Sequence, residues 1–203
     1  TVTCGVTEAV IAALMAVVNP GEHVIVLEPA HENYQAGIAF ADGIPLWVPI
    51  RPPDYRFDPD ELRRAFEGGA KAVIFNSPHN PSGRVFTREE LQFIADLCIK
   101  HDVLAITDEI YEHLVFEGRE HIPIATLPGM EDRTITICGL GKTFAVTGWR
   151  LGYAIACEEL TQGSPLLAHL SRHRAALAQE LRRSRMLGNA GASVLIFRKA
   201  ENR

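Results

Sequence analysis

Polar residues that stand directly after apolar runs are the main candidates for chemistry in this sequence. Asp108 ends one such run, Tyr111 follows it by three positions, and Asn80 lies in the loop after another run. Lys142 and Arg150 flank a loop between the last two apolar runs. The segment of Gly5, Val6 and Thr7 opens a stretch with helical spacing. The chain thus offers a carboxylate, a phenol, an amide, an amine, a guanidinium and a helix N-terminus.

These six kinds of group match one cofactor. Pyridoxal 5'-phosphate (PLP) has a pyridine nitrogen, a phenolic oxygen, an aldehyde and a phosphate, and each of these needs a different partner. A helix N-terminus and an arginine suit the phosphate, because both attract and hydrogen-bond anions. No cysteine pair has metal-ligand spacing, so we expect no metal site. No Ser-His-Asp arrangement for nucleophilic catalysis is recognisable either.

The elements that must position these residues alternate between helix and strand. Helical spacing and start signals predict helices at residues 7–18, 33–40, 58–67 and 87–100. Short apolar runs predict strands at residues 23–27, 44–49, 72–75, 103–107, 134–138 and 151–156. This alternation predicts an α/β fold with a mainly parallel sheet covered by helices on both faces. In such sheets ligands bind beyond the carboxyl ends of the strands, which is where the candidate residues stand.

Composition limits the classes of protein that fit. The 203 residues are 47% hydrophobic and 22% charged, which is typical of a soluble globular domain. A formal net charge of -5 gives no reason to expect nucleic acid or an anionic membrane surface as a partner. No stretch approaches the roughly 20 apolar residues of a membrane span. We expect a cytoplasmic protein whose four cysteines are reduced and mostly buried.

The chain divides at about residue 160. Residues 1–160 carry the alternation and are expected to form the PLP-binding domain, which begins inside a longer protein. Residues 161–203 hold eight Lys or Arg and two Glu, and show no strand-helix alternation. We expect this segment to be an atypical basic tail without an assigned role.

Four motifs carry a resemblance to a known family. The segments CGVTEA, NSPHNPSG, TDEIYEHLVFEG and GKTFAVTGWRLGY resemble the motifs of class I and II aminotransferases, in the same order and spacing. The resemblance covers about residues 1–156 and implies the large domain of a fold-type I PLP enzyme. By this resemblance we expect the small domain of the family to be missing or incomplete in this sequence, and with it the arginine that grips the substrate carboxylate.

The resemblance assigns a role to each candidate. It implies that Lys142 binds PLP as a Schiff base and moves the proton, and that Asp108 pairs with the pyridine nitrogen. Tyr111 and Asn80 would hydrogen-bond the phenolic oxygen. Arg150, Thr7 and the amides of Gly5 and Val6 would hold the phosphate.

Two positions depart from the usual family pattern. His31 stands where many members place an aromatic residue over the cofactor ring, and we expect its imidazole to stack there. Gly139 stands where many members have a serine that binds the phosphate. The phosphate site would then lack one hydroxyl contact.

The implied activity is transfer of an amino group from an L-amino acid to a 2-oxo acid by a ping-pong mechanism, in a homodimer. Two alternatives remain open. A PLP-dependent C–S lyase would share the motifs, and a non-catalytic or regulatory module could be built on the same domain.

Overall fold

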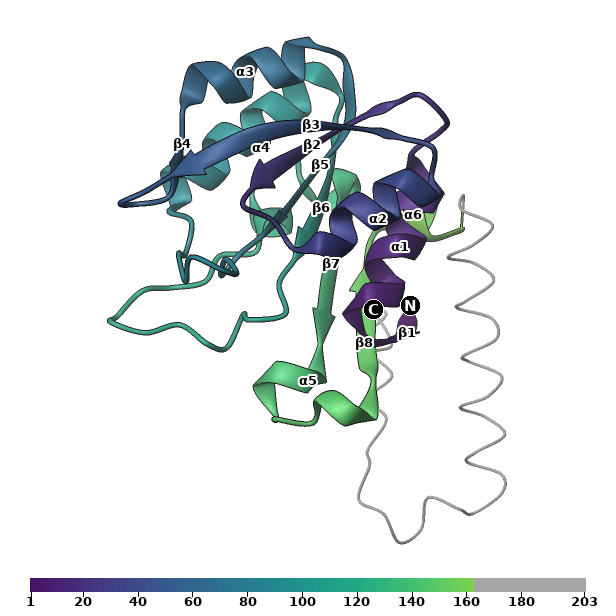
Figure 1. Ribbon diagram of the computed structural model, residues 1–203, viewed down its shortest axis with the longest axis vertical. Helices are drawn as coiled ribbons and strands as arrows, with labels where there is room; N and C mark the ends of the chain where they lie inside the picture. Colours follow the sequence, from purple (N-terminus) through teal and green to yellow (C-terminus); the bar gives the residue numbers. More distant parts are fainter. Residues whose placement is uncertain (163–203) are drawn as a thin grey trace, which may run out of the picture.

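The chain folds around one eight-stranded sheet. The computed structural model describes residues 1–162, and the strand order is β1-β8-β7-β6-β5-β2-β3-β4 (Figure 1). The strands are β1 (Val2–Cys4), β2 (His23–Glu28), β3 (Ile44–Arg51), β4 (Arg56–Phe57), β5 (Ala70–Asn76), β6 (Leu104–Asp108), β7 (Thr134–Gly139) and β8 (Leu151–Ile155). The α-helices are α1 (Gly5–Val17), α2 (Glu32–Phe40), α3 (Pro59–Glu67), α4 (Arg88–His101), α5 (Leu140–Thr143) and α6 (Glu158–Gln162).

The sheet is mostly parallel, as predicted. The five strands β3, β2, β5, β6 and β7 run parallel to their neighbours in that order. Strands β8, β1 and β4 pair in the antiparallel direction at the two ends of the sheet. The predicted elements all occur, with ends shifted by one or two residues. Strands β1 and β4 were not predicted, because three and two residues are too short to show a period.

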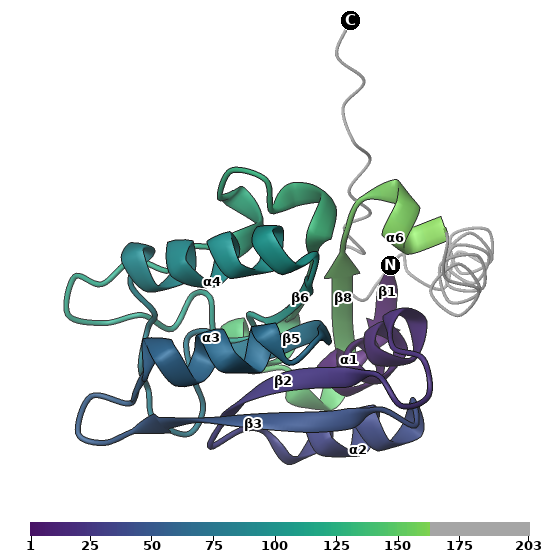
Figure 2. The same ribbon diagram turned by 90° about the horizontal axis from the view of Figure 1, so that it is seen from above.

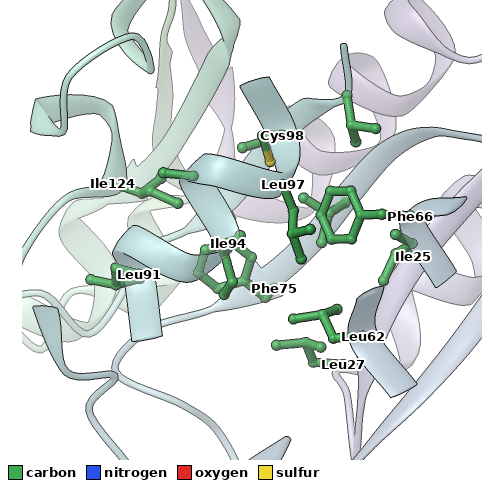
Figure 3. Close-up of a cluster of buried hydrophobic side chains, with 14 of the residues drawn as sticks. Ile25, Leu27, Leu62, Phe66, Phe75, Leu91, Ile94, Leu97, Cys98 and Ile124 are labelled. Atoms are coloured by element: carbon green, nitrogen blue, oxygen red, sulfur yellow. The ribbon is translucent and has the colours of Figure 1, made fainter. Parts of the chain in front are cut away.

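Helices cover both faces of the sheet, as expected. Helices α3 and α4 pack on one face and α2 on the other (Figure 2). Alternate residues of each central strand supply the two cores: in β2, Ile25 and Leu27 face α3 and α4, while Val24 and Val26 face the helices of the other side. Figure 3 shows the first core, where Phe66 and Leu62 of α3 meet Ile94 of α4 over the sheet.

Local signals fix where two of these helices begin. The Asp58 carboxylate accepts hydrogen bonds from the backbone N–H groups of Asp60 (2.8 Å) and Glu61 (3.0 Å), and Pro59 occupies the first turn of α3. Thr87 and Glu90 form a reciprocal capping box at the start of α4. Both starts satisfy backbone donors that have no partner within the helix, so both predicted helix starts are confirmed.

Two facing glycines let α1 approach the sheet closely. Gly139 of β7 lies opposite Gly152 of β8. A β-carbon on Gly152 would collide with the backbone of Gly5, and one on Gly139 would lie 2.9 Å from the backbone oxygen of Leu151. The start of α1 can therefore lie directly on the sheet at this point.

The cysteines follow the expectation only in part. All four thiols are free, and Cys98 and Cys138 are buried, but Cys4 is exposed and Cys157 is half-buried. Cys4 is exposed because it is the outward-facing last residue of β1, at the edge of the sheet. Within residues 1–162 no helix has the length and apolar character that a membrane crossing requires. The predicted basic tail lies outside the described residues apart from the end of α6.

The first core should dominate stability. Ile94→Ala removes three carbons from a side chain with no exposed surface, and we expect it to lower the free energy of unfolding by about 2–5 kcal/mol. Ile99→Ala on the same helix, where the side chain is 43% exposed, is the matched control and should cost well under half as much. Urea denaturation followed by circular dichroism measures both. Similar losses for the two variants would contradict this packing.

Candidate active site

One cavity gathers all nine residues that the sequence singled out. It has a volume of about 310 Å³ and lies beyond the carboxyl ends of β5, β6 and β7. Its walls include Gly5, Val6, Thr7, His31, Asn80, Asp108, Tyr111, Lys142 and Arg150. These residues come from six separate parts of the chain, so only the fold brings them together. The cavity falls in the size range of small-molecule sites, which begins at about 300 Å³.

Asp108 is the buried acid at the base of the cavity. Its carboxylate accepts a hydrogen bond from the Tyr34 hydroxyl at 2.8 Å and one from the backbone N–H of Ile110 at 3.2 Å. Burial raises the pKa of Asp108 above its usual value, while the Tyr34 bond and then the Ile110 bond lower it. The neighbouring Glu109 adds to the rise. Its two recorded hydrogen bonds therefore stabilise the ionised form of a group that burial destabilises.

Tyr34 is a site residue that the sequence analysis did not assign. It stands in the first turn of α2, three positions after His31, and only 2% of its surface is exposed. Burial, and then the charge of Asp108, raise the pKa of Tyr34 well above its usual value. The hydroxyl therefore remains protonated and donates. The spacing from His31 was visible in the sequence, but nothing there showed that Tyr34 would meet Asp108, 74 positions away.

Asn76 is a second unassigned residue, and it connects two candidate ligands. It is the last residue of β5 and lies opposite Asp108 in the parallel register. Its side-chain N–H donates to the carbonyl oxygen of Asp108 at 2.6 Å, and its side-chain oxygen accepts from the backbone N–H of Asn80 at 2.6 Å. Asn76 thus fixes the position of the Asn80 backbone relative to the end of β6.

Tyr111 contacts both the side-chain amide of Asn80 and the amine of Lys142. The Asn80 side-chain N–H donates to the Tyr111 hydroxyl at 3.4 Å. The Lys142 amine lies 5.8 Å from the centre of the Tyr111 ring, within the range of a cation–π contact. Lys142 belongs to the short helix α5, which directly follows the carboxyl end of β7 (Figure 1). The three side chains therefore form one wall of the cavity.

Another part of the cavity lining, formed by Gly5, Thr7 and Arg150, has the character of an anion site. Gly5 begins α1 with a φ of +77°, and a β-carbon there would lie 2.5 Å from the Arg150 guanidinium. The missing side chain lets this cation approach the N-terminus of a 13-residue helix. Thr7 accepts a hydrogen bond from the Asn33 side chain at 3.1 Å. A guanidinium and the positive end of a helix dipole favour a bound anion between them.

The two departures from the family pattern have different outcomes. His31 lines the cavity, and its Nδ1 accepts a hydrogen bond from the Asn33 backbone N–H at 3.3 Å, so it caps α2 as well. Its stacking on a cofactor ring stays a prediction. At Gly139 the backbone of Leu151 and the side chains of Ile110 and Val6 leave no room for a serine.

A second polar group lies beside the cavity, around Glu109, Glu112 and Cys138. Possible ligand atoms of these three lie within 4.8 Å of one another. Glu109 already accepts from the Thr107 hydroxyl at 2.9 Å and contacts His121 at 2.8 Å. Burial raises the pKa of the Cys138 thiol far above its usual value. The Tyr153 hydroxyl donates to Glu112 at 3.4 Å, so both carboxylates of this group already have hydrogen-bonding partners.

Comparisons with known proteins agree with this arrangement. The sequence model of the family "Aminotransferase class I and II" matches residues 1–192. The chain is 48% identical over 164 residues to kynurenine–oxoglutarate transaminase 3 of Rattus norvegicus, covering 76% of this chain and 36% of the rat protein. It is 43% identical over 164 residues to a probable N-succinyldiaminopimelate aminotransferase of Mycobacterium tuberculosis, covering 80% of this chain and 41% of that protein.

Solved structures share the fold. The aromatic aminotransferase of Pyrococcus horikoshii superposes with a TM-score of 0.79 at 37% identity, over 86% of this chain and 46% of that one. A methionine aminotransferase of Escherichia coli superposes with a TM-score of 0.76 at 33% identity, over 83% of this chain and 43% of that one. The chain therefore belongs to the class I and II aminotransferases. It spans less than half the length of each of these four relatives.

The hydrogen bond from Tyr34 should hold Asp108 ionised. Ionisation of a buried carboxyl with a raised pKa costs stability as the pH rises, and the Tyr34 hydroxyl offsets part of that cost. We expect Tyr34→Phe to lower the free energy of unfolding by about 1.5–3 kcal/mol at about pH 8. The loss should be smaller near pH 5, where more of Asp108 is protonated in the folded state.

Urea denaturation at the two pH values measures this difference. Tyr55→Phe is the matched control, because Tyr55 packs against the other core and does not line the cavity. A loss in Tyr34→Phe that is independent of pH would show that the hydroxyl does not act through the Asp108 charge.

Proposed function

We propose that the protein is a PLP-dependent aminotransferase that moves an amino group from an L-amino acid to a 2-oxo acid. The observation that supports this most strongly is the single cavity that brings Lys142, Asp108 and Arg150 together. An amine, a buried acid and an anion site that line one cavity match the aldehyde, ring nitrogen and phosphate of one small molecule. The family is generally PLP-dependent, and the relatives carry the names of transaminases.

The residues present fit that cofactor. Lys142 would hold its aldehyde carbon, and Asp108 its ring nitrogen. Asn80 and Tyr111, which are already joined by a hydrogen bond, would hold its phenolic oxygen. Arg150, Thr7 and the first backbone amides of α1 would hold its phosphate. His31 would cover one face of the ring from the start of α2.

When bound, PLP supplies a ring that accepts electrons from the substrate α-carbon. The chain's own contribution begins with the charge of Asp108, which keeps a ring nitrogen protonated and so strengthens that acceptance. The hydrogen bond from the Tyr34 hydroxyl lowers the pKa of Asp108 against the rise that burial causes, and so favours the ionised form. The Tyr111 hydroxyl and the Asn80 side chain would orient the cofactor by holding its phenolic oxygen.

Lys142 is suited to carry a proton within this cavity. It sits on a four-residue helix directly after β7, and its amine lies beside the Tyr111 ring. A flexible lysine side chain on a short helix can reach both ends of a small proton path. Lys142 would therefore move a proton from the substrate α-carbon to the former aldehyde carbon of the cofactor in the first half of the cycle, and in the reverse direction in the second half.

We propose the amino donor only as a chemical class, an L-amino acid. The named relatives include transaminases of kynurenine, N-succinyldiaminopimelate, aromatic amino acids and methionine, so the shared fold accepts donors of different shape. We propose 2-oxoglutarate as the first acceptor to test, since the rat relative is named for it. A homodimer in the cytoplasm is part of the same proposal.

Attachment of the cofactor should depend on Lys142. After incubation with PLP and reduction by borohydride, we expect mass spectrometry to find the cofactor mass on the peptide that contains Lys142. Lys142→Ala should lose this adduct, whereas Lys100→Ala at the end of α4 should keep it, because Lys100 is exposed on another part of the fold. An adduct on another lysine in the wild-type protein would contradict the assignment.

Turnover should depend on a 2-oxo acid. With a panel of amino donors and 2-oxoglutarate, we expect continuous formation of glutamate together with the oxo acid of the accepted donor. Without 2-oxoglutarate the oxo acid should stop at an amount equal to the enzyme, since the amino group stays on the cofactor. Chromatography of both products measures this. Continuous release of pyruvate and ammonia without an acceptor would identify a lyase instead.

A further inference from the structure

His79 is a buried histidine that does not line the cavity. It stands in the NSPHNPSG loop between β5 and α4, next to Asn80, and only 4% of its surface is exposed. Its backbone is held inside the loop: its N–H donates to the Arg84 carbonyl and its carbonyl accepts from Gly83, both at 2.7 Å. Its side chain leaves the loop and reaches the connection between β2 and α2.

Both ring nitrogens of His79 have partners. Nε2 lies 2.9 Å from the carbonyl oxygen of Pro29, and Nδ1 lies 2.7 Å from the Ser82 hydroxyl. A carbonyl oxygen can only accept, so Nε2 carries the proton. Nδ1 then accepts from Ser82, whose oxygen is also the acceptor for the Arg84 N–H at 3.3 Å. The neutral imidazole thus satisfies every hydrogen bond at this point.

The surroundings favour this neutral form. Burial lowers the pKa of His79, and the nearby charge of Arg84 lowers it further, while the bond to Pro29 opposes both. In this form Nε2 carries the ring proton and donates it to the Pro29 carbonyl oxygen.

Pro29 and His79 each stand close to a wall of the cavity. Pro29 is two positions before His31, which caps α2 and lines the cavity, and His79 is followed directly by Asn80, which also lines it. We propose that His79 is a positioning residue: its bond to Pro29 fixes the distance between the His31 loop and the Asn80 loop, and so sets where the residue over the cofactor ring lies relative to the residue that holds the phenolic oxygen. The identity of the ligand in this inference rests on the proposed function.

Two substitutions distinguish the roles of the two ring nitrogens of His79. In His79→Gln the side-chain amide N–H occupies roughly the position of Nε2 and can still donate to Pro29. In His79→Asn it occupies roughly the position of Nδ1, so the Ser82 contact remains and the Pro29 bond is lost. Circular dichroism and thermal unfolding establish that each variant folds.

PLP binding is the first measurement. We expect His79→Asn to bind PLP about five- to tenfold more weakly than the wild type, the effect of one lost buried hydrogen bond. We expect His79→Gln to bind within about twofold of the wild type. At saturation, the visible circular dichroism of bound PLP should be reduced in His79→Asn only, because it reports the fixed surroundings of the ring.

Equal binding and equal dichroism in the Asn variant and the wild type would overturn the inference. Equal weakening in the Asn and Gln variants would also overturn it, because the Pro29 bond would then not be the cause. If His79→Asn fails to fold, His79→Gln decides alone: binding near the wild-type value supports the inference, and binding about tenfold weaker refutes it.

A second measurement separates this inference from the proposed function. Hydrogen exchange at the amides of Ala30, His31 and Glu32, measured by mass spectrometry without cofactor, should be faster in His79→Asn than in His79→Gln and the wild type. If the wild type binds no PLP, the proposed function fails, yet the exchange rates still decide whether His79 holds this loop. Equal exchange in all three proteins would refute it.

Discussion

The structure depends on how one carboxyl group is held inside the protein. A carboxylate at the end of a central strand is costly to bury. For Asp108 this cost is offset by hydrogen bonds from a phenol of α2 and from a backbone amide of its own loop. Neither donor is close in sequence to the other. Both hydrogen bonds to the Asp108 carboxyl form only when β6 and α2 are in place, so the fold and the site share one requirement.

Parallel register extends this requirement across the sheet. Because β5 and β6 pair with Asn76 opposite Asp108, the asparagine meets the carbonyl of the acid and the amide of Asn80 together. A slip of one residue between these strands would turn Asn76 to the other face and separate Asn80 from Tyr111. The register of two strands therefore sets the geometry of three polar residues in the next loops.

Much of this arrangement could be predicted from the sequence. The alternation of helices and strands, the capping residues Asp58 and Thr87, and the four motifs were enough to anticipate a mainly parallel sheet and the nine residues that line the cavity. Their chemical roles remain predictions.

Tyr34 and Asn76 were missed, because their importance comes from contacts with Asp108 across 74 and 32 positions of the chain. Local patterns carry no record of such distances. The exposure of Cys4 was missed for a related reason: only the position of β1 at the edge of the sheet leaves it in contact with solvent.

The close contact between α1 and the sheet has a consequence for evolution of this site. Gly5, Gly139 and Gly152 lie at one point where added carbon atoms meet backbone or the Arg150 guanidinium. Even alanine at Gly152, the smallest replacement, would collide with the backbone at the start of α1 and push that end of the helix away from the sheet. Gly5 is constrained by conformation as well as by volume, because its φ is +77° and an added carbon atom would displace the Arg150 guanidinium.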